Sequence, residues 1–125
     1  MAKVISEEEF RYKIEQYHSY LREPKWRSGT VVTGPGRSGA VAATYVSHFA
    51  GIPFTPYGVE LPSSIDHVIV VDTATNSGRT LRKAVREYNQ NHSVTPIAFY
   101  DERSFGRLKF WYEIWEEQHG GTEPS

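Results

Sequence analysis

Two glycine-bearing segments carry residue types that can bind an anion. Residues 34–39 have the sequence Gly-Pro-Gly-Arg-Ser-Gly, and residues 72–80 have Asp-Thr-Ala-Thr-Asn-Ser-Gly-Arg-Thr. Glycine lets backbone N–H groups come close to an anion, and Arg37 adds a positive charge to the first segment. In the second segment, serine and threonine hydroxyls can donate hydrogen bonds, and Asp72 can accept them from a sugar diol. We therefore expect a phosphate-binding loop with a carboxylate beside it.

Each of these segments joins an expected strand to an expected helix. Residues 29–33 are short, β-branched and bounded by glycine, while residues 38–50 are rich in alanine and end before a glycine. Residues 67–71 form a continuous apolar run typical of a parallel sheet, and residues 81–88 carry apolar side chains at helical spacing. Residues 95–100 predict a further strand. Strands alternating with helices imply a parallel α/β sheet, which places both glycine-bearing segments at the carboxyl ends of strands, where such folds bind ligands.

The remaining segments predict elements around this core. Ser6 and Glu9 have capping-box spacing, and apolar residues then recur at helical spacing, so we expect a leading amphipathic helix that ends near Pro24. Residues 52–59 predict a weaker strand, interrupted by prolines and glycine, at a sheet edge or with an irregularity. Because no internal repeat or linker is present, we expect one domain over residues 1–125, with a three-layer α/β fold around a parallel sheet.

The composition narrows the classes of function. The chain has 125 residues, 38% of them hydrophobic, which suits one globular domain and excludes intrinsic disorder or a fibrous repeat. Its 14 Lys and Arg against 15 Asp and Glu give a net charge of -1, so no overall positive field would hold a nucleic-acid polymer or an anionic membrane. Cysteine is absent, which excludes a disulfide, a thiol nucleophile and a Cys-based zinc site, and fits a reducing compartment. Since the sequence contains no targeting or membrane-spanning pattern, we expect a cytoplasmic protein.

Each glycine-bearing segment also has a simpler interpretation. Residues 34–39 match Gly-x-Gly-x-x-Gly, and Glu60 lies 21 residues beyond Gly39, as a dinucleotide-binding fingerprint requires. The same pattern also occurs in tight strand-to-helix turns that bind nothing. The second segment could simply cap a helix, with Asn76 or Ser77 as the N-cap residue. A dinucleotide site would explain the first segment but not the second.

The second segment resembles the phosphoribosyl-pyrophosphate signature of type I phosphoribosyltransferases, in which apolar residues precede an acidic pair, two further residues and Asp-Thr-Gly-x-Thr. Residues 37–39, Arg-Ser-Gly, are similar to the pyrophosphate loop of that family. The small xanthine/guanine (6-oxopurine) branch is the nearest likeness, because its chains also begin with an amphipathic helix and a tryptophan-to-glycine lead-in, here residues 26–29. Residues 111–116 are similar to its tryptophan-rich C-terminal hood, which we place at about residues 104–118.

This resemblance implies an activity and a role for individual residues. The family transfers a 5-phosphoribosyl group from phosphoribosyl pyrophosphate to a nucleobase, here of purine type, and uses Mg²⁺; the likeness also implies a homo-oligomer. The catalytic residues it implies are Asp72, Asn76 and Arg37, with Asp72 contacting the metal indirectly through the substrate. The residues it implies for binding phosphoribosyl pyrophosphate are Arg37, Ser38, Gly39, Asp72, Thr73, Ala74, Thr75, Asn76, Ser77, Gly78, Arg79 and Thr80, and those for contacting the base are Tyr100, Trp111 and Trp115.

Three positions depart from the family pattern. Thr73 stands where the family has the second member of its acidic pair, so one carboxylate remains. Asn76 replaces an aspartate near the purine N7; an amide cannot titrate, and general acid–base help is typically worth about 10² to 10⁴ in rate. Tyr100 stands near the place of a lysine that recognises the 6-oxo group, and residues 54–66 lack the basic side chains of a loop that closes over the substrate. Two functions stay open: an active phosphoribosyltransferase, and a relative that binds a phosphoribosyl compound or a nucleotide without turnover.

Other candidate residues have weaker support. No two histidines combine metal-ligand spacing with a carboxylate, so we do not expect a zinc site made by the protein. Asp101 follows the last core strand on the ligand side and could contact the base or Mg²⁺, or belong to a solvated charge cluster with Glu102 and Arg103. The aromatic residues between 110 and 115 could stack on a base, contact a second subunit or pack in the core.

Overall fold

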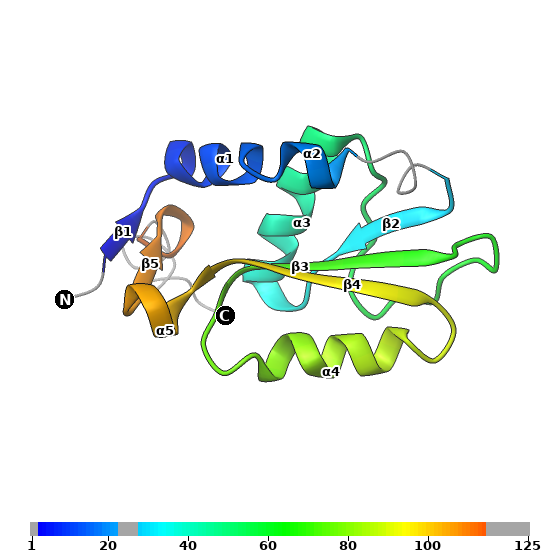
Figure 1. Ribbon diagram of the computed structural model, residues 1–125. Helices are drawn as coiled ribbons and strands as arrows, with labels where there is room; N and C mark the ends of the chain where they lie inside the picture. Colours follow the sequence, from blue (N-terminus) through cyan, green and yellow to red (C-terminus); the bar gives the residue numbers. More distant parts are fainter. Residues whose placement is uncertain (1–2, 23–27, 115–125) are drawn as a thin grey trace, which may run out of the picture.

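The structure is a computed structural model that describes residues 3–22 and 28–114. Its core is a parallel three-stranded sheet with helices on both faces (Figure 1), which confirms the expected three-layer α/β fold. In chain order the elements are β1 (Lys3–Ile5), α1 (Glu7–Glu15), α2 (His18–Leu21), β2 (Thr30–Thr33), α3 (Gly36–Ala50), β3 (His67–Thr75), α4 (Arg79–Tyr88), β4 (Ser93–Asp101), α5 (Glu102–Phe105) and β5 (Leu108–Phe110). None of the helices in the two described ranges is long and apolar enough to cross a membrane.

The central sheet has the strand order β2–β3–β4, and its pairings are parallel. On the other edge of β2, Val32 forms an isolated parallel bridge with Phe54. The strand expected over residues 52–59 is therefore wrong in extent, because the structure describes this whole segment and assigns it that bridge in place of a strand. Pro53 and Pro56 have no N–H to donate, which prevents a longer ladder.

The apolar run of β3 is buried on both faces of the sheet. Ile69 and Val71 belong to the core cluster that α1, α2 and α3 cover, whereas Val68 and Val70 belong to a second cluster against α4. All four side chains are fully buried. Since full burial of such a side chain stabilises the fold by about 1.5 to 3 kcal/mol, β3 is held firmly between the two helical layers. This packing also fixes the position of the carboxyl end of β3, which carries the second glycine-bearing segment.

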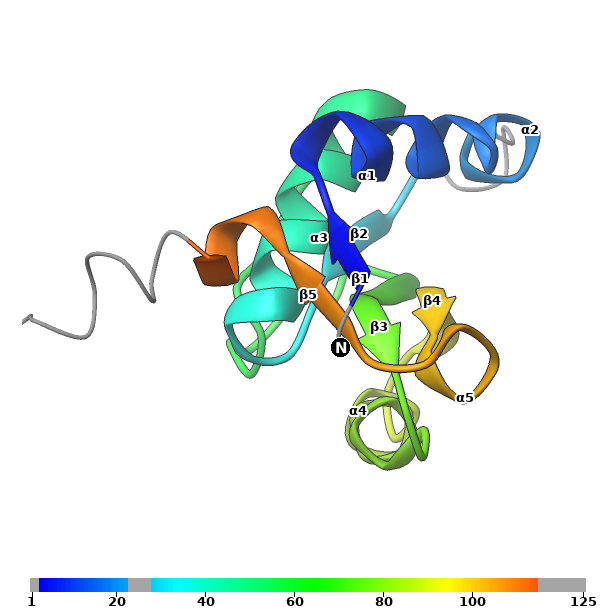
Figure 2. The same cartoon turned by 90° about the vertical axis from the view of Figure 1, so that its left-hand side faces the viewer.

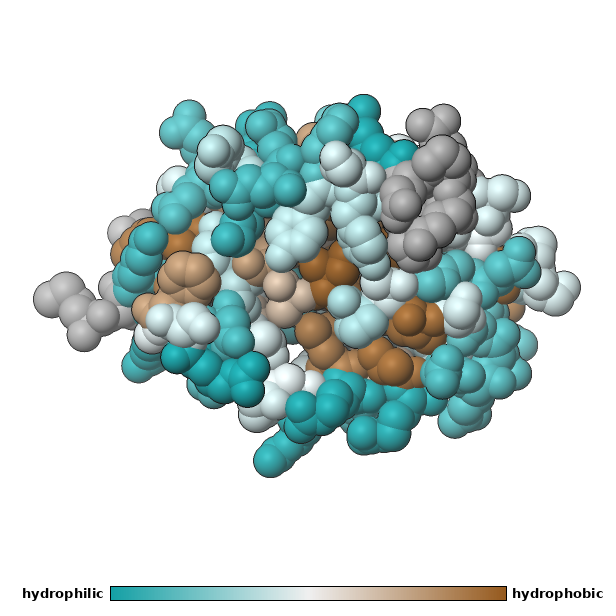
Figure 3. All heavy atoms as spheres, viewed as in Figure 1, coloured by the Kyte–Doolittle hydropathy of each residue, from teal (hydrophilic) through white to brown (hydrophobic). Residues whose placement is uncertain are grey.

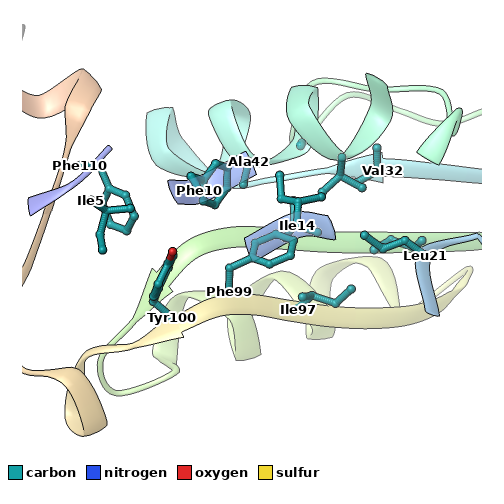
Figure 4. Packing of buried hydrophobic residues seen from close by; sticks show 14 of the residues in the cluster. Ile5, Phe10, Ile14, Leu21, Val32, Ala42, Ile97, Phe99, Tyr100 and Phe110 are labelled. Atoms are coloured by element: carbon teal, nitrogen blue, oxygen red, sulfur yellow. The ribbon is translucent and has the colours of Figure 1, made fainter. Parts of the chain in front are cut away.

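The leading segment forms two short helices in place of the single helix expected. The hydroxyl of Ser6 caps α1 by accepting a hydrogen bond from the N–H of Glu9 at 3.0 Å, as the capping-box spacing predicts. Both helices pack on the α3 side of the sheet, where their apolar side chains are buried (Figure 4). The helix end expected near Pro24 and the tryptophan of the lead-in, Trp26, lie outside the described residues.

The hood combines both ends of the chain. β1 pairs in parallel with β5, and Ile5 lies opposite Phe110. Both side chains are buried and join the main core cluster (Figure 4). Figure 2, which looks at this end of the molecule, shows the pair in front of the carboxyl ends of the central strands. We expected the hood at about residues 104–118, and β5 lies within that range. The sequence did not predict β1, which pairs with β5, because three residues are too few for a periodic pattern to reveal.

Candidate functional site

The two glycine-bearing loops lie side by side at one edge of the central sheet. β2 ends at Thr33, which pairs with Val70, whereas β3 continues for five more residues to Thr75. The end of β3 therefore lies beside the turn into α3. The approach is close, because a Cβ on Gly34 would lie 2.6 Å from the carbonyl oxygen of Val71. Both loops thus open at the carboxyl edge, as expected for adjacent parallel strands.

Glycines at both ends of the first loop allow it to fold back on itself. A Cβ on Gly34 would lie 2.1 Å from the carbonyl oxygen of Gly39, and a Cβ on Gly39 would lie 2.5 Å from the carbonyl carbon of Gly34. Gly36 has a φ of +67° and open space around it, so its backbone conformation accounts for the third glycine. The shape of the loop therefore explains all three glycines of the pattern without a dinucleotide. Arg37 and Ser38 occupy the first turn of α3, beside this fold.

The second loop encloses a cavity of about 130 Å³. This volume is well below the roughly 300 Å³ at which pockets begin to take drug-sized molecules, so the cavity suits a group as small as a phosphate. The residues that line it are Asp72, Ala74, Thr75, Asn76, Ser77, Gly78, Arg79, Thr80 and Leu81. The structure thus brings together every residue that we assigned to this segment except Thr73.

Gly78 begins α4 at the rim of this cavity. It is the N-cap residue and has a left-handed backbone with a φ of +79°, so neither Asn76 nor Ser77 caps the helix, as the simpler interpretation of the segment required. Ser77 holds the turn instead: its Oγ accepts a hydrogen bond from the N–H of Arg79 at 3.3 Å. Its carbonyl accepts another from Nη1 of Arg82 at 2.9 Å. The first turn of α4 lines the cavity, so the positive end of the helix dipole faces it, although the N–H of Arg79 is already donated to Ser77.

Asp72 lies within β3 and not after it, because the strand extends to Thr75. Its backbone pairs with Ala98 of β4, and its side chain lines the phosphate-sized cavity. Burial raises the pKa of Asp72 to about 6, and this rise is opposed by a hydrogen bond from the N–H of Thr73 to Oδ1 at 2.8 Å. A carboxylate in a cleft that titrates close to neutral pH is a common feature of functional sites.

Thr73 points to the opposite face of β3, because successive side chains of a strand alternate. It is buried, and its Oγ1 lies 3.1 Å from the hydroxyl of Tyr112 in the hood. That hydroxyl also donates to Oγ of Ser38 at 3.0 Å, so Tyr112 connects the hood to both loops. Burial raises the pKa of Tyr112, which keeps the phenol protonated at neutral pH. Tyr112 has no role predicted from the sequence beyond its place in the aromatic run, because the family resemblance assigns the base contact to the nearby tryptophans.

The residues that we expected to contact the base do not share one environment. Tyr100 is 5% exposed, and its ring packs edge-on against Phe105 of α5 and Phe110 of β5. Figure 4 labels Tyr100 and Phe110. Trp111 packs against Phe10 of α1 and Tyr45 of α3, with ring centroids 5.6 and 5.8 Å apart. Trp115 lies outside the described residues. The two described rings thus anchor the hood to the core, and their contact with a base stays a prediction.

Asp101 ends β4 beside Thr75 and caps α5. It accepts a hydrogen bond from the N–H of Arg103 at 2.9 Å and two from its guanidinium at 3.1 and 3.0 Å. Arg103 lowers the pKa of Asp101, so this carboxylate is ionised at neutral pH. The observed ion pair favours a solvated charge cluster over a ligand contact. Within residues 3–22 and 28–114, no group of three His, Cys, Asp or Glu side chains is placed to hold a metal ion.

The fold has clear counterparts among solved structures, although no family model and no curated protein matches the sequence. A xanthine-guanine-hypoxanthine phosphoribosyltransferase from Helicobacter pylori has a TM-score of 0.73 at 11% identity, over 97% of this chain and 99% of its own. A purine phosphoribosyltransferase from Pyrococcus horikoshii has a TM-score of 0.66 at 16% identity, over 90% and 93%. A hypothetical protein from Neisseria gonorrhoeae with bound ppGpp has a TM-score of 0.68 at 12% identity, over 97% and 96%.

The chain therefore has the fold of the type I phosphoribosyltransferases, and the resemblance inferred from its sequence is confirmed. Its structural counterparts include enzymes of purine and 6-oxopurine bases, as the likeness to that branch implied. At this low identity the likeness concerns the fold, because one fold supports many activities. The residues of the site have to carry any statement about the reaction.

Proposed function

We propose that the protein transfers a 5-phosphoribosyl group from phosphoribosyl pyrophosphate to a purine-type nucleobase and releases pyrophosphate. The observation that carries this proposal is the half-buried carboxylate of Asp72 in the wall of a phosphate-sized cavity, with the second glycine loop beside it. A sugar phosphate with an anionic leaving group needs these three elements next to one another. The purine phosphoribosyltransferases of the same fold support the choice of substrate class.

The proposed roles follow the order of groups along the substrate. The loop at residues 75–80 and the first turn of α4 hold the 5′-phosphate, and Asp72 accepts hydrogen bonds from the ribose hydroxyls. Arg37 and Ser38, in the first turn of α3, hold the pyrophosphate. Gly39 contributes its lack of a side chain, which allows the close approach to Gly34. Its N–H does not bind the pyrophosphate in this proposal, because it is already donated to the carbonyl of Pro35 at 3.1 Å.

Little covalent chemistry is required of the protein in this reaction. The bond from the anomeric carbon to pyrophosphate breaks, the leaving group takes the electron pair, and a ring nitrogen of the base bonds to that carbon while the base releases one ring N–H proton to water. Positive charge and N–H donors placed where the leaving group gains charge lower the barrier, and fixed positions for both substrates supply much of the rest. The first turn of α3 with Arg37 is suited to the first task.

Mg²⁺ is part of the proposal. This ion keeps several waters and binds through one or two carboxylates together with substrate phosphates. Asp72 is the carboxylate that lines the cavity, so the described side chains fit an ion that arrives with pyrophosphate and do not fit a metal site built by the protein alone. When bound, the ion would neutralise charge on the leaving group.

A protein that binds a nucleotide without turnover is the second candidate function. Two observations favour it: Thr73 is a buried hydroxyl in place of a carboxylate, and Asn76 at the cavity cannot titrate. The ppGpp-bound protein from Neisseria gonorrhoeae also shows that a chain of this fold and length can bind a nucleotide. This candidate keeps the phosphate cavity and the Asp72 contact but loses the chemical step.

Mass spectrometry of the nucleotides formed distinguishes the two candidates. The protein is mixed with Mg²⁺, phosphoribosyl pyrophosphate and xanthine, guanine, hypoxanthine, adenine, uracil and orotate. One mononucleotide product is the expected result and names the base; binding of phosphoribosyl pyrophosphate without any product selects the second candidate. The same proposal assigns the protein to cytoplasmic purine salvage as a homo-oligomer, and light scattering would measure its assembly.

A further inference from the structure

Three hydroxyl groups form a chain from β3 through the hood to the first loop. Oγ1 of Thr73 lies 3.1 Å from the hydroxyl of Tyr112, and that hydroxyl donates to Oγ of Ser38 at 3.0 Å. A hydroxyl carries a single proton, so a tyrosine that donates to Ser38 can only accept from Thr73. The donor direction therefore runs from Thr73 to Tyr112 to Ser38. In this arrangement Ser38 does not donate to Tyr112, so its proton remains for another acceptor.

We propose that Tyr112 is a positioning residue that orients the hydroxyl of Ser38 as a hydrogen-bond donor to the pyrophosphate of the substrate. The inference rests on the proposed function, which supplies the anion. Ser38 lies in the first turn of α3, where the helix dipole already favours negative charge. Each hydroxyl in such a chain polarises the next, which strengthens the final donor.

The ring of Tyr112 is held by packing that does not depend on its hydroxyl. It stacks on Phe110, with ring centroids 5.7 Å apart and an angle of 13° between planes, and meets Trp111 edge-on at 5.0 Å. Phe110 is 3% exposed, and its N–H donates to Oε1 of Glu113 at 2.8 Å. A phenylalanine in place of Tyr112 should therefore keep the ring where it is and remove the hydroxyl alone.

The threonine at position 73 sets the direction of the chain of hydroxyls. A threonine can donate to Tyr112, whereas a carboxylate at this place could only accept and would draw the phenol proton away from Ser38. Position 73, where the family has the second acid of its pair, thus carries a hydroxyl that contacts Tyr112 of the hood. Replacement of Thr73 by valine removes the donor at nearly constant volume and leaves no charge.

Calorimetric titration with inorganic pyrophosphate in the presence of Mg²⁺ tests the proposal on the full chain. We expect Ser38→Ala to weaken binding about 10- to 150-fold, since a hydrogen bond to a charged group contributes about 1.5 to 3 kcal/mol and about 1.4 kcal/mol is a factor of ten. Tyr112→Phe and Thr73→Val should each weaken it roughly 3- to 5-fold, because they disorient the donor without deleting it. The double variant of Ser38 and Tyr112 should bind no more weakly than Ser38→Ala alone.

Tyr57→Phe is the matched control, since it removes a tyrosine hydroxyl that contacts Glu87 of α4 and should leave pyrophosphate affinity unchanged. Thermal unfolding of every variant checks that the chain is folded. Wild-type affinity in folded Tyr112→Phe, or additive losses in the double variant, would overturn the inference alone. A wild-type protein that binds neither pyrophosphate nor phosphoribosyl pyrophosphate would overturn the proposed function and the inference together.

Discussion

Asp72 shows how a site residue can oppose the stability of its own fold. Burial raises its pKa from 3.8 to about 6, so the folded protein binds this proton more tightly than the unfolded chain does. The folded state therefore loses stability as the pH rises from about 4 to about 6, and the loss is complete above that range. Two pKa units correspond to about 3 kcal/mol, which we reduce to roughly 1 to 2 kcal/mol because the side chain keeps some contact with water.

The variant Asp72→Asn should accordingly be more stable than the wild type at pH 8, by roughly 1 to 2 kcal/mol, and equally stable at pH 4 or below. Urea unfolding at pH 4, 6 and 8 measures this difference. The same variant should bind phosphoribosyl pyrophosphate at least 10-fold more weakly, because it loses the charge that accepts from the ribose diol. A variant that gains stability at high pH and keeps full affinity would remove Asp72 from the site.

Asn76 is the residue at which the chemical step can be tested most directly. It is exposed at the cavity, so an aspartate there meets no steric obstacle. If a missing titratable group limits turnover, Asn76→Asp should raise kcat by about 100-fold, the lower end of what general acid–base catalysis supplies. Asn76→Ala is the control, since it has neither a donor nor an ionisable group. An unchanged or lower kcat in the aspartate variant would contradict this account.

At the scale of elements, the first loop depends on the contact between its two end glycines. Gly39→Ala would place a Cβ 2.5 Å from the backbone of Gly34 and 2.9 Å from the ring of Pro35, so the loop has to open. Overpacking of this kind costs about 1 to 3 kcal/mol and occasionally more, and here the nearest atom in the way belongs to the backbone. Gly36→Ala is the matched control: it has free space and meets only the strain of its φ of +67°, which costs about 1 to 2 kcal/mol.

Chemical unfolding of the two glycine variants, followed by titration with pyrophosphate, measures both effects. We expect Gly39→Ala to lose more stability than Gly36→Ala and also to lose pyrophosphate affinity, because the first turn of α3 moves with the loop. Equal stability of the two variants would mean that the loop tolerates an open form.

The segment between Phe54 and β3 is fixed to α4 and is not placed to close over the site. Tyr57, Leu61 and Ile65 pack against the cluster between the sheet and α4. The N–H of Gly58 also donates to the hydroxyl of Tyr88 at 3.0 Å. Since these contacts hold the segment on the α4 face, exclusion of water from the proposed site falls to the hood. This agrees with the lack of basic side chains over residues 54–66.

The sequence predicted those elements whose signals are local. The apolar run of β3, the periodic apolar face of α4 and the glycine loops each lie within about ten residues, so pattern alone placed both loops at the carboxyl edge. The pairing of β1 with β5 joins residues about a hundred positions apart and has no local signal. The role of Tyr112 depends on the same long-range arrangement. The extension of β3 through Asp72 to Thr75 was also missed, because polar residues at a strand end resemble a loop.

At the scale of the whole molecule, β4 is an edge strand of the central sheet, and no other described strand pairs with its outer edge. Figure 3 shows apolar side chains gathered over β4, between α1 and α4. Leu81, Val85 and Pro96 line a groove of about 520 Å³ there, with Arg82 and Arg86 beside it. Pro96 has no N–H, and basic side chains lie along the groove, so this edge is poorly suited to the addition of another strand.

The hood and the core are joined through Ile5, and this connection gives the last prediction. Ile5 is fully buried opposite Phe110, so Ile5→Ala should lower the free energy of unfolding by about 2 to 5 kcal/mol. Because β5 leads directly into the helical residues 111–114, which include Tyr112, the variant should also bind pyrophosphate more weakly at a temperature where it remains folded. Val4→Ala is the matched control, since Val4 is 52% exposed on the same strand and should change stability by less than about 0.5 kcal/mol. Thermal unfolding and pyrophosphate titration of both variants measure the two effects, and a loss of stability without a loss of affinity would show that the hood does not support the site.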